Sequence, residues 1–225
     1  MAISVKEPGR RWTPRAVTGR LEFLEIGTNE FDTLLGSSYP GPGKSVEALK
    51  FYQDKLPDRT GVEKVNAAVV GDDTLYGRDG AEPITFYFVH PANISRFKLP
   101  PDFKGMSSVA APNPQVAAEL RRRGLWHLLE SAFVPTTSYV RLVASATSIG
   151  FVKLDIEGGE PGLMRDLASE CRRRKLCPDR IQFEHKWFRH GVLEKHLREL
   201  RAVGYTCTRQ TYDARCSFDE VYAHQ

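Results

Sequence analysis

The chain has 225 residues, of which 41% are hydrophobic and 27% are charged, so it is long enough for one large domain with a sizeable core. The formal net charge is +4, and residues 1–20 account for all of it with five basic side chains and one acidic side chain. A neutral body argues against a protein that coats nucleic acid. No apolar run reaches the roughly 18 residues of a membrane span. We expect a basic arm over 1–20 and one domain over 21–225.

The cysteines show neither a zinc pattern nor a disulfide framework. There are four of them, and no two form a CxxC pair. Their simplest interpretation is buried thiols in a reducing compartment, which predicts a cytoplasmic protein. An organelle-targeting role of the Arg-bearing arm stays open beside an irregular surface arm. The cysteines are Cys171, Cys177, Cys207 and Cys216.

In the first half of the chain, short apolar runs alternate with a helical pattern. Strands are expected at 21–26, 44–47, 65–70 and 84–89, the last beside the main sheet, with a helix whose apolar face carries Leu49, Phe51, Tyr52 and Leu56. Residues 90–112 are rich in Pro, Gly and Ser and show no period. They predict a long loop that acts as a lid or substrate loop.

The second half continues the alternation and ends in a hairpin. Helices are expected at 114–123, 161–174 and 192–202, strands at 150–155 and 180–184, and the hairpin strands at 205–210 and 216–222. Strand–helix alternation predicts an α/β fold, with a doubly wound, mostly parallel sheet and an antiparallel C-terminal edge.

In such sheets ligands bind beyond the carboxyl ends of the strands. The first strand ends at Gly27, where the absence of a side chain permits close approach of the backbone to a ligand. Glu47 ends the second strand, about twenty residues further on, the spacing at which a carboxylate can hold ribose hydroxyls. The competing interpretation of Glu47 is a solvated helix cap.

Two further strand ends carry acids. Asp155-Ile-Glu157-Gly158-Gly159-Glu160 follows an apolar strand, and Glu184-His185 follows the next. Such carboxylates can bind a divalent cation, act as a base or cap a helix. We favour a ligand or catalytic role for Asp155, and for Glu160 a capping role is an equal alternative.

These residues resemble the FkbM-type S-adenosylmethionine-dependent methyltransferases over about residues 21–187. The most specific likeness is Lys153-Leu-Asp155-Ile-Glu157-Gly158-Gly159-Glu160, and the others are Phe23–Asn29, Ser45–Glu47, Val65–Ala68 and Ile181–His185. The resemblance implies a class I methyltransferase fold with seven strands, the last antiparallel, and methyl transfer to a hydroxyl oxygen.

The resemblance also implies residue roles. The methionine end of the cofactor would be held by Glu25, Gly27 and Asn29, the ribose by Glu47, and the adenine by Ala48 and Asn66–Ala68, with Ser107 and Ser108 closing over it. One departure concerns the glycine loop, where Phe31 stands at a position that many members give to a second glycine.

Methyl transfer needs an aligned acceptor and a path for its proton. The candidates for base and orienting residue are Asp155 and His185. The alternative is a divalent cation such as Mg²⁺, held by Asp155 and Glu184 with His185, which would lower the pKa of the acceptor hydroxyl. The acceptor expected from the resemblance is a sugar or another hydroxylated small molecule.

Three rival functions remain. Phe31 and the basic arm favour a catalytically inactive subunit or scaffold with the same fold. A nucleic-acid methyltransferase is disfavoured because Asp155-Ile-Glu157-Gly158 stands where such enzymes often carry Asn/Asp-Pro-Pro-aromatic. A nicotinamide-dependent oxidoreductase is disfavoured because the first strand is not followed by GxGxxG. The sequence leaves the oligomeric state open and predicts no membrane partner.

Overall fold

The computed structural model describes residues 19–28, 33–36, 41–71, 83–109, 111–156, 158–186, 188 and 191–219. Predictions that concern residues 1–18, Asn29, Phe31 and Glu157 lie outside these ranges. The described chain divides into two compact units, one formed by residues 83–135 and the other by the rest. The predicted boundaries, an arm over 1–20 and a domain over 21–225, stay predictions.

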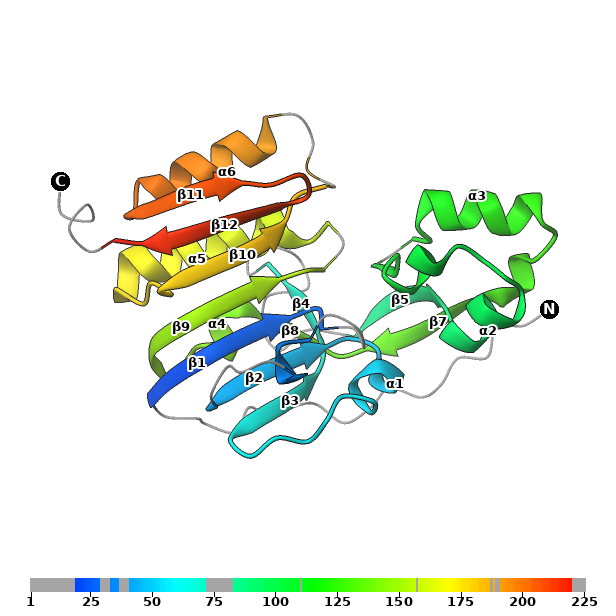
Figure 1. The fold of residues 1–225 in the computed structure, drawn as a ribbon, viewed down its shortest axis with the longest axis horizontal. Helices are drawn as coiled ribbons and strands as arrows, with labels where there is room; N and C mark the ends of the chain where they lie inside the picture. Colours follow the sequence, from blue (N-terminus) through cyan, green and yellow to red (C-terminus); the bar gives the residue numbers. More distant parts are fainter. Residues whose placement is uncertain are drawn as a thin grey trace. The chain divides into compact units, whose positions relative to one another are not determined.

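The larger unit is built on a seven-stranded sheet (Figure 1). The strand order is β3-β2-β1-β9-β10-β12-β11, and β12 alone runs antiparallel to its neighbours. This confirms the predicted α/β fold with its antiparallel hairpin and is consistent with class I methyltransferase topology. The strands are β1 (Gly19–Ile26), β2 (Gly43–Glu47), β3 (Val62–Asn66), β9 (Ala146–Leu154), β10 (Arg180–Glu184), β11 (Tyr205–Arg209) and β12 (Asp213–Phe218).

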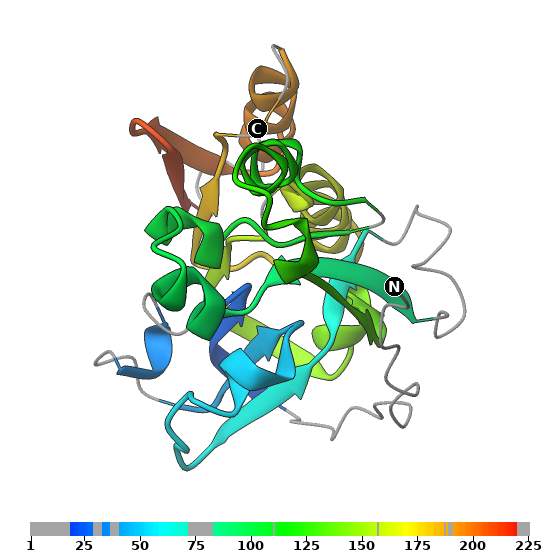
Figure 2. The same cartoon turned by 90° about the vertical axis from the view of Figure 1, so that its right-hand side faces the viewer.

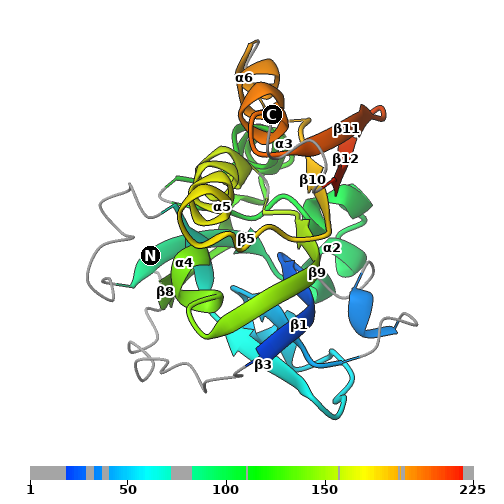
Figure 3. The ribbon, with the colours of Figure 1, turned by 90° about the vertical axis from the view of Figure 1, so that its left-hand side faces the viewer.

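One face of this sheet is covered by α4 (Tyr139–Leu142), α5 (Glu160–Arg174) and α6 (Val192–Arg201), as Figure 3 shows. Because side chains alternate along a strand, residues in register share a face. Leu24 and Val152 are in register and belong to the main core cluster on the helical face. Phe23 and Phe151, also in register, form a smaller cluster on the opposite face.

The connections after β2 and β3 differ from the predictions. Helix α1 covers only Lys50–Gln53, although the predicted face residues Leu49, Tyr52 and Leu56 are buried. The run predicted as one strand over 65–70 is divided into two strands, because β3 ends at Asn66, opposite Glu47, the last residue of β2. The chain continues as β4 (Ala68–Val70), which pairs with β8 (Thr136–Ser138) in a separate sheet. A short 3₁₀ helix, η1, spans Leu34–Gly36.

The smaller unit corrects the predicted long loop. Its sheet has the order β6-β5-β7, so β5, expected beside the main sheet, pairs elsewhere. Pro91 and Pro101 stand in the first turns of helices, where the fixed φ of proline is favourable. The elements, drawn in teal and green in Figure 2, are β5 (Ile84–Val89), α2 (Pro91–Arg96), η2 (Pro101–Lys104), β6 (Ser108–Val109), α3 (Pro114–Arg122), η3 (Trp126–Leu128) and β7 (Leu129–Val134).

The prediction of free thiols is wrong. One disulfide joins Cys171, near the C-terminal end of α5, to Cys177, which follows the helix. The other joins Cys207 to Cys216 across the β11–β12 hairpin. The latter two are register partners, which places their side chains on one face. Among the described helices, none is both long and apolar enough to cross a membrane.

Candidate functional site

Four of the predicted positions meet at the carboxyl edge of the main sheet. Register pairs Ile26 with Val46 and with Leu154, and Leu154 with Phe183. The residues that follow these four positions therefore lie side by side: Glu47, Gly27, Asp155 and Glu184. Backbone hydrogen bonds continue the ladder at this edge, from Gly27 to Val46 (3.0 Å) and from Asp155 to Ile26 (2.9 Å).

Gly27 makes the turn after β1. Its φ is +80°, which disfavours any side chain, and a Cβ there would lie 1.7 Å from the carbonyl oxygen of Asp155. The chain leaving β1 thus lies directly against the chain leaving β9. Only glycine permits this approach.

Glu47 is buried at the end of β2, and its carboxylate fixes the chain just before α1. Its Oε1 accepts a hydrogen bond from the Leu49 amide at 2.8 Å. The Asn66 side-chain amide donates to the carbonyls of Glu47 and Ala48, both at 2.9 Å, and so ties the end of β3 to the end of β2. Glu47 is thus a buried carboxylate at the carboxyl edge and not the solvated helix cap of the competing interpretation, since the cap residue of α1 is Leu49. Its predicted ribose role stays a prediction.

Ala68, predicted to contact the adenine, and Ser108, predicted to close over the cofactor, do not lie at the ends of the main-sheet strands. Ala68 is buried in β4, where it pairs with Thr136. Ser108 belongs to the smaller unit, and its hydroxyl donates to the Ala111 carbonyl at 2.7 Å. Their predicted contacts with a cofactor stay predictions.

Three carboxylates gather at the edge. One oxygen each of Asp155, Glu160 and Glu184 lies within 4.8 Å of the others. Glu160, which is 1% exposed, stands in the first turn of α5 and accepts hydrogen bonds from the amides of Ile156 and Gly158, each at 2.8 Å. These amides precede the helix, so Glu160 fixes the turn before α5 and does not cap the helix as predicted. Burial, reinforced by the nearby Asp155 carboxylate, raises the pKa of Glu160 to about 7, although the backbone donors oppose the rise.

Carboxylate oxygens suit a hard cation such as Mg²⁺, so this trio could hold one. The trio contains Asp155 and Glu184 from the predicted metal set, adds Glu160, and does not include His185. Lys186 already pairs with Glu184 at 2.7 Å.

His185 follows β10, and its backbone amide donates to the Tyr212 carbonyl at 2.7 Å. Its Nε2 atom is buried and has no hydrogen-bond partner among the residues that the structure describes. A buried ring nitrogen of this kind can accept a proton or a hydroxyl hydrogen bond from a ligand. The predicted pairing of His185 with Asp155 stays a prediction.

Sequence analysis missed Lys153 as a charged group of this region. It is buried in β9, with its Nζ 3.8 Å from Oε1 of Glu25, which is fully buried in β1. The available signal was a lysine inside the apolar run from Phe151 to Leu154, since a buried lysine needs a partner.

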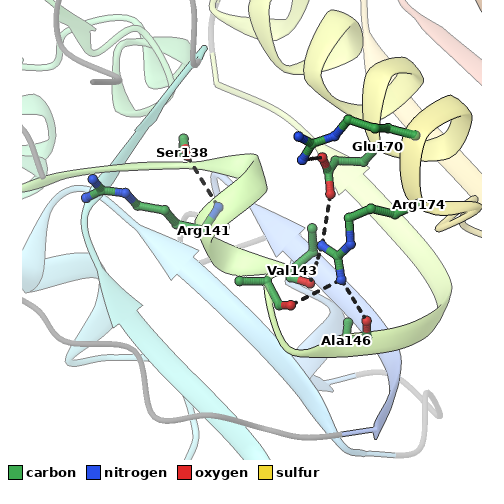
Figure 4. A network of polar contacts seen from close by, with 8 residues as sticks. Ser138, Arg141, Val143, Ala146, Glu170 and Arg174 are labelled. Carbon is green, nitrogen blue, oxygen red and sulfur yellow. Dashed lines mark hydrogen bonds and ion pairs between the residues drawn. The ribbon is translucent and has the colours of Figure 1, made fainter. Parts of the chain in front are cut away.

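The far end of α5 carries a different polar cluster (Figure 4). Buried Glu170 accepts hydrogen bonds from Arg173 (2.8 Å) and Arg174 (2.9 Å). Arg174 also donates to three backbone carbonyls, those of Val143, Ala144 and Ala146. This network ties α5 to the segment between α4 and β9, at the amino end of β9.

Comparison of the chain with family models, with curated proteins and with solved structures finds no match. The sheet topology and the edge geometry are therefore the observations on which a function rests.

Proposed function

We propose that the protein is an S-adenosylmethionine-dependent methyltransferase that methylates a hydroxyl of a small molecule or sugar. The observation that carries the proposal is the contact of the Gly27 turn with Asp155 at the carboxyl edge of a sheet with class I order. Neighbouring Glu47 ends the next strand of the same edge. Open doubly wound sheets bind ligands at this edge.

The residues present fit this cofactor in charge and in space. Its sulfonium is a cation, and the edge gathers Asp155, Glu160 and Glu184. The bare backbone at Gly27 allows close approach of the methionine end, and Glu47 provides a carboxylate for ribose hydroxyls. The resemblance assigns the adenine to Ala48 and Ala68, whose side chains are small.

When bound, the cofactor supplies an electrophilic methyl group on its sulfonium. The chain must then orient the acceptor hydroxyl and receive its proton. Asp155 is our candidate base because it lies at the strand end, against the Gly27 turn. His185, with its buried Nε2, is the second proton acceptor. The acceptor oxygen gains the methyl group, and its proton passes to the base.

A catalytically inactive subunit with the same fold is the alternative. It is favoured by the contacts of the edge acids with the chain itself, since Glu160 accepts two backbone amides and Glu184 pairs with Lys186. An inactive subunit can retain cofactor binding, so binding and turnover must be measured separately.

Calorimetric titration of the full chain with S-adenosylmethionine and S-adenosylhomocysteine tests the proposal. We expect saturable 1:1 binding that Glu47→Gln weakens at least tenfold, while the control Glu22→Gln, near the opposite end of β1, does not. No heat and no thermal shift at millimolar ligand would reject a cofactor-binding role. If the chain binds the cofactor but forms no S-adenosylhomocysteine with any of a panel of hydroxylated acceptors, the inactive subunit is favoured.

The cation at the three carboxylates is tested with the same assay. If a divalent ion supports transfer, a chelator abolishes product release and Mg²⁺ restores it. Transfer that is insensitive to the chelator would leave Asp155 as a base without metal.

A further inference from the structure

Two buried charges, not assigned to a step of the proposed reaction, face each other on neighbouring strands beneath the acidic edge. Glu25 of β1 is 0% exposed and Lys153 of β9 is 4% exposed. They are register partners, and Nζ of Lys153 lies 3.8 Å from Oε1 of Glu25. Both lie on the sheet face of Phe23 and Phe151, which come two positions earlier on the same strands.

Both oxygens of the Glu25 carboxylate accept hydrogen bonds from the segment that follows the glycine turn. Oε2 accepts from the Thr33 hydroxyl at 2.9 Å, and Oε1 accepts from the Leu34 amide at 2.8 Å. The Thr33 hydroxyl in turn accepts from the Leu35 amide at 3.1 Å. Residues 33–35, where η1 begins, are therefore fastened to the centre of the sheet by one carboxylate.

The same segment is also held by apolar packing. Leu34 and Leu35 pack in the cluster of Phe23 and Phe151, the residues two positions before Glu25 and Lys153 on their strands. Polar contacts thus fix residues 33–35, and apolar packing adds to them at Leu34 and Leu35.

Lys153 supplies the positive charge that such an arrangement needs. A buried carboxylate without a cation is costly, and here three further carboxylates lie at the edge above it. Lys153 keeps Glu25 compatible with the ionised state, in which both oxygens act as acceptors.

We infer that Glu25 and Lys153 are a positioning pair for the cofactor site. The pair fixes the backbone of residues 33–35, which follow the glycine turn in the sequence, and neither side chain touches the cofactor. This inference rests on the proposed function. It assigns Glu25 an indirect role, through Thr33 and Leu34, in place of direct contact with the methionine end.

The test measures S-adenosylhomocysteine binding by calorimetry for the full chain and for Glu25→Gln, Lys153→Met and the double variant. We expect each single change to raise Kd 10- to 100-fold and the double change to raise it by far less than the product of the two. The control is Lys44→Met, since Lys44 is equally buried (1% exposed) and pairs with Glu63 at 3.4 Å, but on the helical face. We expect its Kd to stay within twofold.

Hydrogen exchange of the Leu34 amide gives a readout that needs no cofactor. We expect exchange to accelerate at least tenfold in Glu25→Gln and Lys153→Met and to stay unchanged in Lys44→Met. Should a single variant not fold, the neutral double variant and Lys153→Arg, which retains the charge and is expected to retain affinity, keep the comparison possible.

The outcomes separate the inference from the function. If the unmodified chain binds no cofactor, the proposed function fails, and the Leu34 exchange still tests the positioning role. If the unmodified chain binds and Lys153→Met matches Lys44→Met in both Kd and Leu34 exchange, the positioning pair is refuted.

Discussion

Helix α5 carries a buried glutamate near each of its ends, and the polar contacts of the two glutamates differ. Glu170, at the C-terminal end, is held by two guanidinium groups that neutralise it. Glu160, at the N-terminal end, is held by two backbone amides and lies beside other carboxylates, and its pKa is raised by burial and by the nearby Asp155 carboxylate. Both glutamates are 1% exposed, so burial does not distinguish them.

The difference indicates which end of α5 is the candidate for a catalytic site. A neutralised buried charge joins elements, and the Glu170–Arg174 network does this for α5 and the start of β9. A buried acid beside other acids costs stability, which is the usual pattern at catalytic sites. The acidic end of α5 is the end at the carboxyl edge of the sheet. The comparison therefore predicts that changes at one end affect activity and changes at the other affect stability.

The largest expected effect is that of Asp155→Asn on methyl transfer. Removal of the base should lower the rate by about 10²–10⁴-fold, since that is the usual contribution of general-base catalysis. The melting temperature should stay the same or rise, because the repulsion between the Asp155 and Glu160 carboxylates is removed. Product release measured under saturating cofactor checks the rate, and undiminished turnover would remove Asp155 from the mechanism.

At the other end, Arg174→Ala should destabilise the fold by about 3–5 kcal/mol, because it leaves the buried Glu170 carboxylate short of a cation. Urea unfolding measures the loss. Arg173→Ala is the matched control, since its side chain is 67% exposed and its pair should contribute less than about 1 kcal/mol. Cofactor affinity should be unchanged in both. An equal loss in the two variants would contradict the structural role of Arg174.

The main sheet and its carboxyl edge could largely be predicted from the sequence, because several strands of this sheet are apolar runs that stop at glycine or an acid. That pattern located Gly27, Glu47, Asp155 and Glu184, which the structure brings to one edge. The smaller unit escaped prediction because its elements between residues 90 and 112 are two to six residues long, too short to show a period.

Other features depend on contacts between distant segments. The pairing of Lys153 with Glu25 exists only once β1 and β9 are in register, and an apolar run does not reveal its partner. The Cys207–Cys216 disulfide likewise follows from hairpin register, because no spacing motif marks it. Glu160 was weighed as a cap or a ligand, and the structure has it accept the amides of the turn before α5 and belong to the carboxylate trio.

The raised pKa of Glu160 predicts a pH dependence of stability. The pKa is about 7 in the folded chain against an ordinary value of 4.5, so the folded state retains a proton that the unfolded state has lost. Stability should therefore fall as pH rises from about 4.5 to about 7, by about 3 kcal/mol in total. Glu160→Gln should lack this decline. Urea unfolding of both proteins at several pH values measures the difference, and parallel curves would contradict the shift.

The smallest expected effect is that of reducing the disulfide at the C-terminal end of α5. Cys171–Cys177 closes a short loop that begins directly after Glu170 and contains Arg174, so its loss should cost about 2–3 kcal/mol, mainly through the entropy of the unfolded chain. Cys171→Ser/Cys177→Ser should show this loss in urea unfolding, with cofactor affinity unchanged because the acidic end of α5 is not touched. The unmodified chain treated with reductant should match it once the loss of Cys207–Cys216 is measured separately in its own double variant. If the unreduced chain reacts with a thiol reagent at all four cysteines, the pairing itself is wrong. If affinity falls together with stability, the two ends of α5 are coupled rather than separate.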